Sequence, residues 1–265
     1  VVVDWEDDTS VRMSAAQLYD LVFEGNNKWM LSANGTIFTY EYEAIIPGLL
    51  KRWYEERQEM QRKMRECGDN EIEREYWDKR QLVKKINLNS LYGAILNPGC
   101  RFFDIRIGQS VTLTGRCITK HMASKVNEIV TGEYDHKGES IVYGDTDSVY
   151  FSAYKTLQKE IKDGLIPWTK DSVVGLYDKI SEEVNSSFKS FMTKAFHTPA
   201  TRGEVIAAGR ELVASKGLFI TKKRYAVLYY DKEGKRTDVE GKAGKMKAMG
   251  LDLKRSDTPV FVQDF

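Results

Sequence analysis

Two aspartates stand two residues apart within the apolar segment from Ile141 to Phe151. β-prone residues flank the run Gly144-Asp145-Thr146, which is typical of a tight turn, so the segment predicts a short hairpin with Asp145 and Asp147 at its tip. Carboxylate oxygens suit Mg²⁺, which keeps waters and phosphate oxygens in its remaining positions. The pair is therefore a candidate catalytic metal site, and an ordinary Asp-rich turn is the alternative interpretation.

A second candidate set stands earlier in the chain, at helical spacing. On a helix, Lys85, Asn89 and Tyr92 fall within about 60° of one another and form one stripe. An ammonium group, an amide and an aromatic ring that face a shared space are able to hold a phosphate, a base pair and a sugar. A separate apolar cluster leaves this stripe free of the hairpin's own core: Ile72, Tyr76, Val83 and Ile86. An exposed helix face is the alternative.

Arg57 strengthens the phosphate interpretation. It belongs to a predicted helix that precedes a turn at Cys67 to Asn70, and Lys85 belongs to the helix that follows the turn. Antiparallel pairing places the two cations about 11 and about 16 residues from the apex, an offset of about 7 Å along the axis. Two cations at this spacing predict a polyphosphate site, with Arg suited to bidentate contacts and Lys to a point-charge contact.

Charge is segregated along the chain although the net charge is only +1. Residues 1–45 carry a net charge of −6, whereas residues 216–255 carry +7. The basic stretch contains the run Lys222-Lys223-Arg224-Tyr225 and further tyrosines. Such a stretch favours contact with a nucleic-acid backbone, and a solvated charged face is the alternative.

The elements that must position these residues fall into three stretches. Residues 1–45 are mixed, with a turn at Asn34-Gly35, and residues 46–97 predict two antiparallel helices. Residues 98–265 predict helices through Val111 to Ile129 and Leu176 to Ala195, followed by β-rich segments at Glu204 to Ala214 and Leu218 to Tyr230. This pattern predicts an α+β fold, an antiparallel sheet with helices on one face.

Length and composition exclude several classes of protein. The 265 residues, 42% of them hydrophobic, predict a globular protein, and no apolar run reaches the roughly 20 residues that span a bilayer. The first 30 residues do not resemble a secretion signal, so we expect a cytoplasmic protein. The cysteines, Cys67, Cys100 and Cys117, form no Cys-x-x-Cys pair, which favours reduced thiols over a zinc site. The Val-Val-Val start and the end at Phe265 predict a fragment.

These motifs together resemble those of family B DNA polymerases. The run Lys85-Ile-Asn-Leu-Asn89-Ser-Leu-Tyr92-Gly93 resembles their fingers motif, and Tyr143-Gly-Asp145-Thr-Asp147-Ser resembles their palm carboxylate motif. Lys222-Lys-Arg-Tyr225 resembles their basic motif. The similarity is greatest to the T-even phage branch and extends over most of the chain, through Ser32-Ala-Asn-Gly35, Ser215-Lys-Gly217, Gly250-Leu251 and Ser256-Asp-Thr-Pro259.

The resemblance implies a role for each motif residue. Residues 1–45 and 98–265 would form the palm, and residues 46–97 the fingers. The implied substrates are deoxynucleoside triphosphates and primer–template DNA. Arg57 and Lys85 would grip the triphosphate, and Asn89 and Tyr92 would line the nascent base-pair pocket. Asp147 would be shared by two catalytic Mg²⁺ ions, with Asp145 beside it as a ligand or electrostatic partner. The duplex would be held by Lys222, Lys223, Arg224 and Tyr225.

The chain also departs from the family pattern. The family places another essential Asp in a segment that ends in Ser-Leu-Tyr-Pro-Ser, and this sequence has no such segment. Val1-Val-Val-Asp4 resembles a strand that ends in that Asp, but the Ser-Leu-Tyr-Pro-Ser continuation is missing. The length leaves no room for an exonuclease domain or a thumb. We therefore expect an incomplete metal site and no primer extension by the chain alone. Remaining polymerase segments or a companion polypeptide would be partners, with a sliding clamp as a candidate. A non-catalytic nucleic-acid-binding module derived from a polymerase is the alternative; a reverse transcriptase is disfavoured because Thr146 separates the aspartates.

Overall fold

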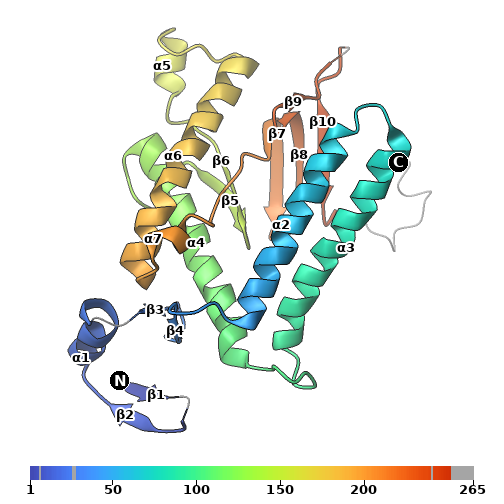
Figure 1. Ribbon diagram of the computed structural model, residues 1–265. Helices are drawn as coiled ribbons and strands as arrows, with labels where there is room; N and C mark the ends of the chain where they lie inside the picture. The colour runs from blue at the N-terminus through green and yellow to red at the C-terminus, as the bar shows by residue number, and fades with distance from the viewer. Residues whose placement is uncertain (6, 26–27, 240, 252–265) are drawn as a thin grey trace. The chain divides into compact units, whose positions relative to one another are not determined.

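The computed structural model describes residues 1–5, 7–25, 28–239 and 241–251 (Figure 1). The chain forms two compact units, one of residues 1–114 with 196–198 and the other of residues 115–195 with those from 199 onward. Helices combine with antiparallel strands in both units, which confirms the predicted α+β class. The similarity at Ser256 to Pro259 lies outside the described residues.

A helical hairpin dominates the first unit. Helices α2 (Ile45–Glu66) and α3 (Glu71–Ile95) lie side by side, joined by a short turn (Figure 1). Pro47 stands in the first turn of α2, where no backbone N–H is needed. Gly68 adopts a φ of +55° in the turn, and the Asn70 side chain accepts the N–H of Glu73 (3.2 Å) and so begins α3. The predicted helices and their turn are confirmed.

The remainder of the first unit consists of small elements around the start of α4 (Ile105–Thr131). Asn34 connects them to α4: its Nδ2 donates to the carbonyl oxygen of Arg106 (3.1 Å), and its Oδ1 accepts from Ser110 Oγ (2.9 Å). The predicted turn at Asn34-Gly35 is confirmed and joins two strands. The small elements are β1 (Val2–Asp4), β2 (Ser10–Arg12), α1 (Ala15–Tyr19), the π-helical turn η1 (Asp20–Glu24), β3 (Trp29–Leu31) and β4 (Ile37–Thr39).

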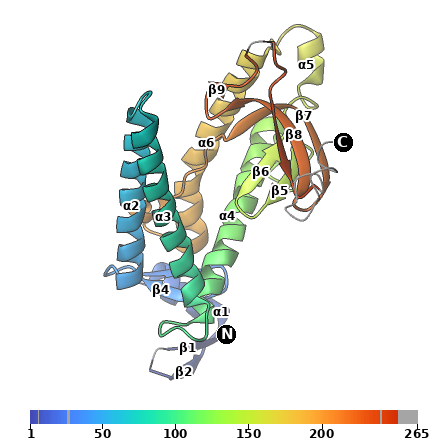
Figure 2. The same cartoon turned by 90° about the vertical axis from the view of Figure 1, so that its right-hand side faces the viewer.

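Two long helices cover a β-hairpin in the second unit. The C-terminal part of α4 packs beside α6 (Lys170–Phe196), and both contact the hairpin of β5 (Ile141–Asp145) and β6 (Ser148–Phe151) (Figure 2). The core between the helices is apolar and buried, with Ile141 and Phe151 of the hairpin packed against it; its buried members are Val126, Ile180, Val184 and Phe188. The hairpin therefore has a rigid support.

A second antiparallel sheet completes this unit. Its strands are β7 (Leu212–Thr221), β8 (Arg224–Lys232) and β10 (Lys245–Met249), in the order β10-β8-β7, and β9 (Lys235–Arg236) pairs with β8. The start of α6 covers it, because Val173 packs against Val213 and Tyr230. Two short helices, α5 (Gln158–Lys162) and α7 (Ala200–Gly203), lie outside the sheet.

The strand predicted from Glu204 begins only at Leu212. The reason lies in Asn185 on α6, whose Oδ1 accepts the Ala208 N–H (2.7 Å) and whose Nδ2 donates to the Ala208 carbonyl oxygen (2.6 Å). A side chain thus satisfies the backbone groups that a neighbouring strand would otherwise pair with. Over the described ranges, no helix is both long and apolar enough to cross a membrane.

Candidate functional site

The two aspartates lie at the tip of the β5–β6 hairpin, as predicted. Asp145 ends β5 and pairs with Ser148, so Thr146 and Asp147 form a two-residue turn. Thr146 has a φ of +53°, a left-handed conformation that favours glycine and that a β-branched residue rarely adopts. Asp145 is half-buried and Asp147 is exposed.

Hydroxyl groups hold this tip in place. Thr146 Oγ1 donates to Asp145 Oδ1 (3.2 Å), and Ser148 Oγ donates to the backbone carbonyl oxygen of Asp145 (3.2 Å). From α4, Thr119 Oγ1 donates to the carbonyl oxygen of Thr146 (2.7 Å). In the part of the chain that the structure describes, neither aspartate forms an ion pair. Both carboxylates therefore keep oxygen atoms that are open to a cation.

The donor set of the hairpin fits a hard cation with open coordination positions. Two carboxylates supply oxygen ligands, and Mg²⁺ commonly uses one or two carboxylates with waters and phosphate oxygens. Within residues 1–5, 7–25, 28–239 and 241–251, no three His, Cys, Asp or Glu side chains come together to hold a metal ion. Asp4 of β1 instead accepts a hydrogen bond from Ser10 Oγ (2.6 Å). Asp145 and Asp147 are thus the candidate ligands of this chain.

The predicted basic motif forms the turn between β7 and β8. Thr221 pairs with Arg224, so Lys222 and Lys223 are the two turn residues, and Lys223 has a φ of +62°. Lys222, Lys223 and Arg224 are exposed, whereas Tyr225 is only 8% exposed. Three cations on one exposed turn suit a phosphate backbone, while Tyr225 belongs to the interior.

Gly250 lies directly against this basic turn, after the end of β10. Its φ is +59°, and an added Cβ would come within 2.1 Å of the Lys223 carbonyl oxygen. Only glycine combines that backbone conformation with so close an approach. The Gly250-Leu251 similarity therefore has a structural explanation, because the residue lets the chain pass beside the lysines.

An aromatic cluster connects the basic turn to the aspartate hairpin. Its ring centroids are 5.2 to 6.1 Å apart, and its members are Tyr143, Tyr150, Phe219 and Tyr225. The backbone N–H of Lys223 donates to Tyr143 Oη (2.7 Å), and Tyr150 Oη donates to Tyr225 Oη (3.2 Å). Burial raises the pKa of Tyr150. Because Tyr143 stands two residues before Asp145, the cluster fixes the cationic turn relative to the carboxylates.

The predicted stripe on α3 lies in the other unit. Lys85 and Asn89 are exposed, and Tyr92 is half-buried. Tyr92 Oη donates to the carbonyl oxygen of Gly108 in the first turn of α4 (3.1 Å). That hydrogen bond fixes the tyrosine ring at the base of the hairpin, while the lysine and the asparagine remain open to a ligand.

Arg57 lies at the level expected from the sequence. Its Nε donates to Gln81 Oε1 across the two helices (3.2 Å). Gln81 stands one helical turn before Lys85, so the two cations are about 6 Å apart along the axis, close to the predicted offset. The structure thus brings Arg57 and the stripe together within one unit, and the aspartates and the basic turn together within the other.

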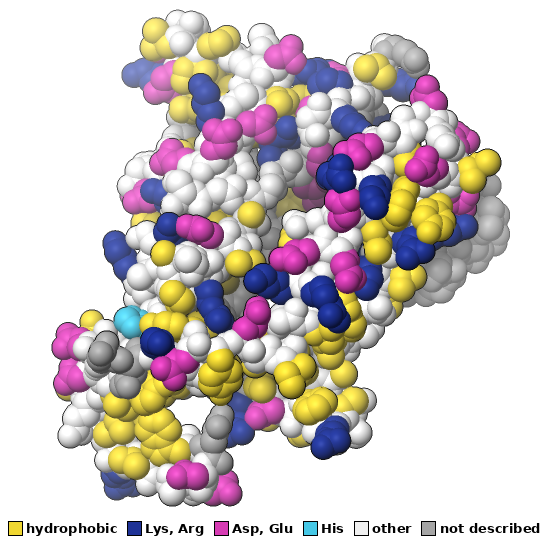
Figure 3. Space-filling view, viewed as in Figure 1, with side chains coloured by type: hydrophobic (Ala, Val, Ile, Leu, Met, Phe, Trp, Pro, Cys, Tyr) yellow, Lys and Arg dark blue, Asp and Glu magenta, His cyan; other side chains and the backbone are white. Residues whose placement is uncertain are grey.

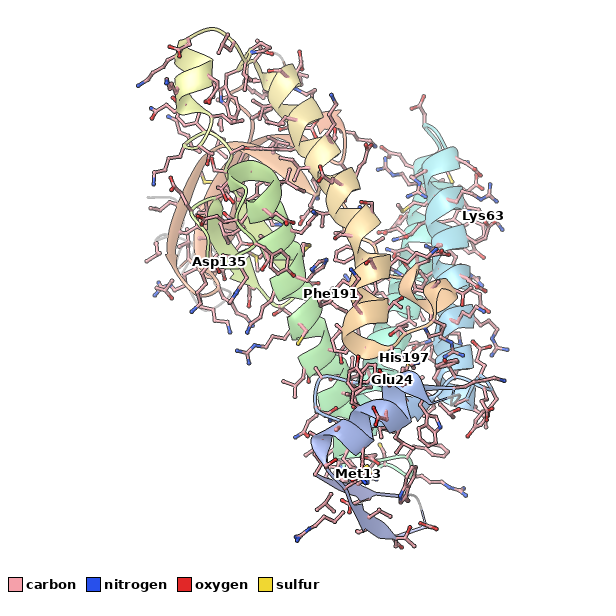
Figure 4. All side chains as sticks on the ribbon, turned by 90° about the vertical axis from the view of Figure 1, so that its left-hand side faces the viewer. Met13, Glu24, Lys63, Asp135, Phe191 and His197 are labelled. Carbon is pink, nitrogen blue, oxygen red and sulfur yellow. The ribbon has the colours of Figure 1, made fainter. Side chains whose placement is uncertain are left out.

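Polar and cation–aromatic contacts join α2 to α3. Lys84 Nζ lies 2.5 Å from Glu56 Oε2 and 5.6 Å from the centre of the Trp53 ring. This hydrogen bond lowers the pKa of Glu56. Nearer the turn, Lys63, labelled in Figure 4, places its Nζ 4.7 Å from the centre of the Trp77 ring. Lys84 therefore contributes to the contact between α2 and α3. Its neighbour Lys85 remains available for a ligand.

The apolar cluster of α3 faces solvent. The exposed fractions of its members range from 49% to 84%; these members are Ile72, Tyr76, Val83 and Ile86. Lysine and arginine side chains alternate with carboxylates and apolar groups on the visible face of α2–α3 (Figure 3). The prediction that this cluster forms the hairpin's own core is therefore wrong, because its side chains are exposed.

Sequence reasoning missed the residues that support the three motifs. Thr119, Tyr143 and the carbonyl group of Gly108 each hold a site residue through one hydrogen bond. The aromatic residues on either side of the aspartates were a usable signal for Tyr143. No comparable signal marked Thr119, because it stands 27 residues before Thr146 in an ordinary helical pattern.

Comparison with known proteins agrees with the motifs. A model of DNA polymerase family B matches residues 6–265. The DNA-directed DNA polymerase of Escherichia phage RB69 is 33% identical over 195 residues, and that of Enterobacteria phage T4 is 30% identical over 196 residues. Each match covers 69% of this chain, which spans only 21% of either relative. The family B DNA polymerase from the hyperthermophilic archaeon Pyrobaculum calidifontis has a TM-score of 0.46 at 20% identity, over 86% of this chain and 23% of that one.

Proposed function

The chain belongs to DNA polymerase family B, and from this premise we propose that it forms the fingers and palm portion of a DNA-directed DNA polymerase. The observation that carries the proposal is the hairpin that presents Asp145 and Asp147 beside the exposed turn of Lys222 and Lys223. The Tyr143 hydrogen bond to the Lys223 backbone couples the two. A carboxylate pair and a phosphate-binding turn are two of the parts that nucleotide addition to a primer needs.

The proposed reaction extends a primer by one deoxynucleotide at a time. The primer 3′ oxygen forms a bond to the α-phosphorus of the triphosphate, the bond to the pyrophosphate leaving group breaks, and the 3′-hydroxyl proton is lost. Two Mg²⁺ ions, held with Asp147 as a shared ligand and Asp145 beside it, would stabilise the attacking and leaving oxygens. The remaining contribution of this chain is positioning of the two substrates.

The other residues would hold the substrates. Arg57 and Lys85 would neutralise the triphosphate, because both supply cationic donors from neighbouring levels of α2–α3. Asn89 and Tyr92 would line the nascent base pair. Lys222, Lys223 and Arg224 would contact the duplex backbone, while Tyr225 would act from the aromatic cluster by holding β8. Residues 46–97 would thus be the fingers, and residues 1–45 and 98–265 the palm.

Nucleotide binding by the hairpin tests this assignment. We expect Lys85→Ala and Arg57→Ala each to weaken binding of a fluorescent deoxynucleoside triphosphate about tenfold, the loss expected for one charge-assisted hydrogen bond. Fluorescence anisotropy with the purified chain measures the affinity. A labelled duplex titrated in parallel should bind both variants with unchanged affinity, because neither residue belongs to the proposed duplex site.

Lys79→Ala is the matched control. Lys79 is an exposed lysine on the same helix, outside the stripe, and its Nζ pairs with Glu75 Oε1 (2.8 Å). Its replacement removes the same charge from α3 but should leave nucleotide affinity unchanged. Equal losses of nucleotide affinity in Lys79→Ala and Lys85→Ala would show that the effect comes from net charge alone. Unchanged affinity in all three variants would show that the stripe is not part of the nucleotide site.

One observation favours a second candidate function. In the described ranges, the two aspartates are not joined by a third potential ligand. A nucleic-acid-binding module derived from a polymerase, without catalysis of its own, would have this property. It would bind the duplex through Lys222 to Arg224 but would gain no activity when other polymerase segments are supplied.

A further inference from the structure

Helix α4 reaches the turn between the two aspartates through a single hydroxyl group. Thr119 Oγ1 lies 2.7 Å from the carbonyl oxygen of Thr146 and 3.1 Å from that of Gly115. A hydroxyl group has one hydrogen to donate. Because 2.7 Å is the usual length of an O–H···O hydrogen bond and 3.1 Å is longer than usual, Thr146 is the stronger acceptor.

The turn needs such a support because its backbone is strained. Thr146 is β-branched and has a φ of +53°, where glycine is preferred. A residue in this conformation persists only where the surrounding structure imposes it. The pairing of Asp145 with Ser148 constrains both ends of the turn, and the Thr119 hydroxyl constrains the peptide group in its middle.

The peptide group that Thr119 contacts joins Thr146 to Asp147, which is a proposed metal ligand. The carbonyl group of Thr146 lies in one plane with the nitrogen and Cα of Asp147, because the peptide bond is planar. In the part of the chain that the structure describes, no hydrogen bond or ion pair holds the Asp147 side chain itself. The orientation of its carboxylate therefore depends on the backbone that Thr119 fixes.

We propose that Thr119 is a positioning residue that sets the Thr146–Asp147 peptide so that both aspartates face one divalent cation. The proposal rests on the proposed function, because it assumes that Asp145 and Asp147 bind that cation. Thr119 acts through Thr146 and touches neither carboxylate. Its removal should therefore weaken metal binding without changing the ligands themselves.

Titration of the full 265-residue chain with MnCl₂ tests this role. Paramagnetic broadening of the backbone amide signals of residues 145–148 measures Mn²⁺ binding at the hairpin. We expect Thr119→Val, which keeps the shape of the side chain and removes the hydroxyl, to raise the Mn²⁺ midpoint about 3- to 10-fold, as the loss of one hydrogen bond predicts. Thr119→Ser should restore the wild-type midpoint because it returns the donor.

Thr112→Val is the matched control on the same helix. Thr112 Oγ1 donates to the carbonyl oxygen of Gly108 (3.1 Å), the same i to i−4 hydrogen bond that Thr119 has available with Gly115. Its replacement should leave the Mn²⁺ midpoint at the wild-type value. An equal shift in Thr112→Val and Thr119→Val would assign the effect to α4 in general and overturn the positioning role.

Asp147→Asn separates failure of this proposal from failure of the proposed function. Broadening that is lost in Asp147→Asn but unchanged in Thr119→Val would leave the metal ligand in place and overturn the role of Thr119. Broadening that is unchanged in Asp147→Asn would overturn the proposed metal site itself, and the role of Thr119 with it. Loss in Asp147→Asn, a shifted midpoint in Thr119→Val and recovery in Thr119→Ser would support both.

Discussion

At the scale of single residues, His121 shows how a buried polar side chain is stabilised. Its Nδ1 lies 2.7 Å from Tyr134 Oη and its Nε2 lies 2.9 Å from Ser187 Oγ, while its ring stacks on Phe191 (labelled in Figure 4). Ser187 Oγ donates its hydrogen to the carbonyl oxygen of Val184 (2.6 Å), so it accepts from Nε2. Both ring nitrogens therefore have a hydrogen-bond partner inside the protein.

This arrangement predicts a dependence of stability on pH. Burial lowers the pKa of His121 below its ordinary value of 6.5, Lys125 lowers it further, and Glu128 has a smaller opposite effect. Below that value the unfolded chain binds a proton that the folded chain does not, so the free energy of unfolding falls as pH falls. Thermal unfolding followed by circular dichroism should give a lower Tm at about pH 5.5 than at about pH 7.5.

Two variants test whether His121 causes this dependence of Tm on pH. His121→Gln cannot titrate and should lose most of the Tm difference between the two pH values, although its Tm at neutral pH will itself be lower. His136→Gln is the control, because His136 is half-buried and faces Asp135 rather than a closed polar network. A pH slope that persists in His121→Gln would assign it to other groups.

The sequence identified the site residues by type but not their supporting contacts. Asp145 and Asp147 were recognisable as two carboxylates in a predicted turn, and Lys222 and Lys223 as part of a basic run. The prediction of one β-rich segment from Leu218 to Tyr230 was wrong at these lysines, because they form the turn between β7 and β8. The burial of Tyr225 was not predictable, because a tyrosine in a strand can face either side of its sheet. The direction of a hydroxyl such as that of Thr119 depends on tertiary contacts, which a single sequence does not reveal.

At the scale of elements, the β7–β8 turn combines exposed charge with a fixed backbone. Tyr143 Oη accepts the Lys223 N–H, and Gly250 lies against the Lys223 carbonyl oxygen, so both sides of this residue are constrained. A turn whose backbone is fixed before a ligand arrives loses less entropy on binding. This turn is therefore the element of the second unit best arranged to bind a phosphate backbone.

Salt dependence measures that property directly. Each phosphate contact contributes about 0.9 to the slope of log affinity against log salt concentration, so Lys222→Ala/Lys223→Ala should reduce the slope for duplex DNA by about 2. Anisotropy titrations of a labelled primer–template at several salt concentrations give the slope. The wild-type chain should bind progressively more weakly as salt increases.

Lys232→Ala/Lys235→Ala is the matched control for this element. These exposed lysines pair across β8 and β9 at the opposite end of β8, so the double variant removes the same charge from the same sheet. Its slope should equal that of the wild type. Equal reductions in both double variants would show that duplex binding follows net charge, and the specific role of the β7–β8 turn would be wrong.

Helices were more predictable than strands in this chain. The bounds of α2 and α3 follow from local signals, namely Pro47 in a first turn and Asn70 as an N-cap. The late start of β7 depends on Asn185, which is remote in sequence and occupies the backbone groups of Ala208. The exposure of Ile86 and Val83 likewise depends on which face of α3 meets α2, and the face in contact carries Lys84, which pairs with Glu56.

At the scale of the whole molecule, the residues proposed to bind ligands are divided between two compact units. The nucleotide stripe belongs to the unit of residues 1–114, and the aspartates and basic turn belong to the unit that begins at residue 115. The α+β class was predictable because helical and strand patterns alternate along the sequence. The division into these two units was not predictable from the sequence. Its boundary lies within α4, which has one continuous helical pattern.

Binding and catalysis should therefore be separable in this chain. We expect the 265-residue chain to bind a primer–template and a deoxynucleoside triphosphate but not to extend the primer with Mg²⁺ and all four nucleotides. The physical reason is the ligand set, in which the described residues bring no third acid to Asp145 and Asp147. A labelled primer resolved on a denaturing gel measures extension, and anisotropy under the same conditions shows that the substrates are bound.

The double variant Asp145→Asn/Asp147→Asn is the control for primer extension. Extension present with the wild type and absent with the double variant would mean that the chain completes its own catalytic site, which contradicts the expectation. Extension equal in both would come from a contaminating enzyme, since the variant lacks both candidate ligands. With the remaining polymerase segments supplied in trans, a polymerase portion should gain extension that depends on Asp147. A non-catalytic module should bind the duplex as before and still extend nothing, even with those segments present.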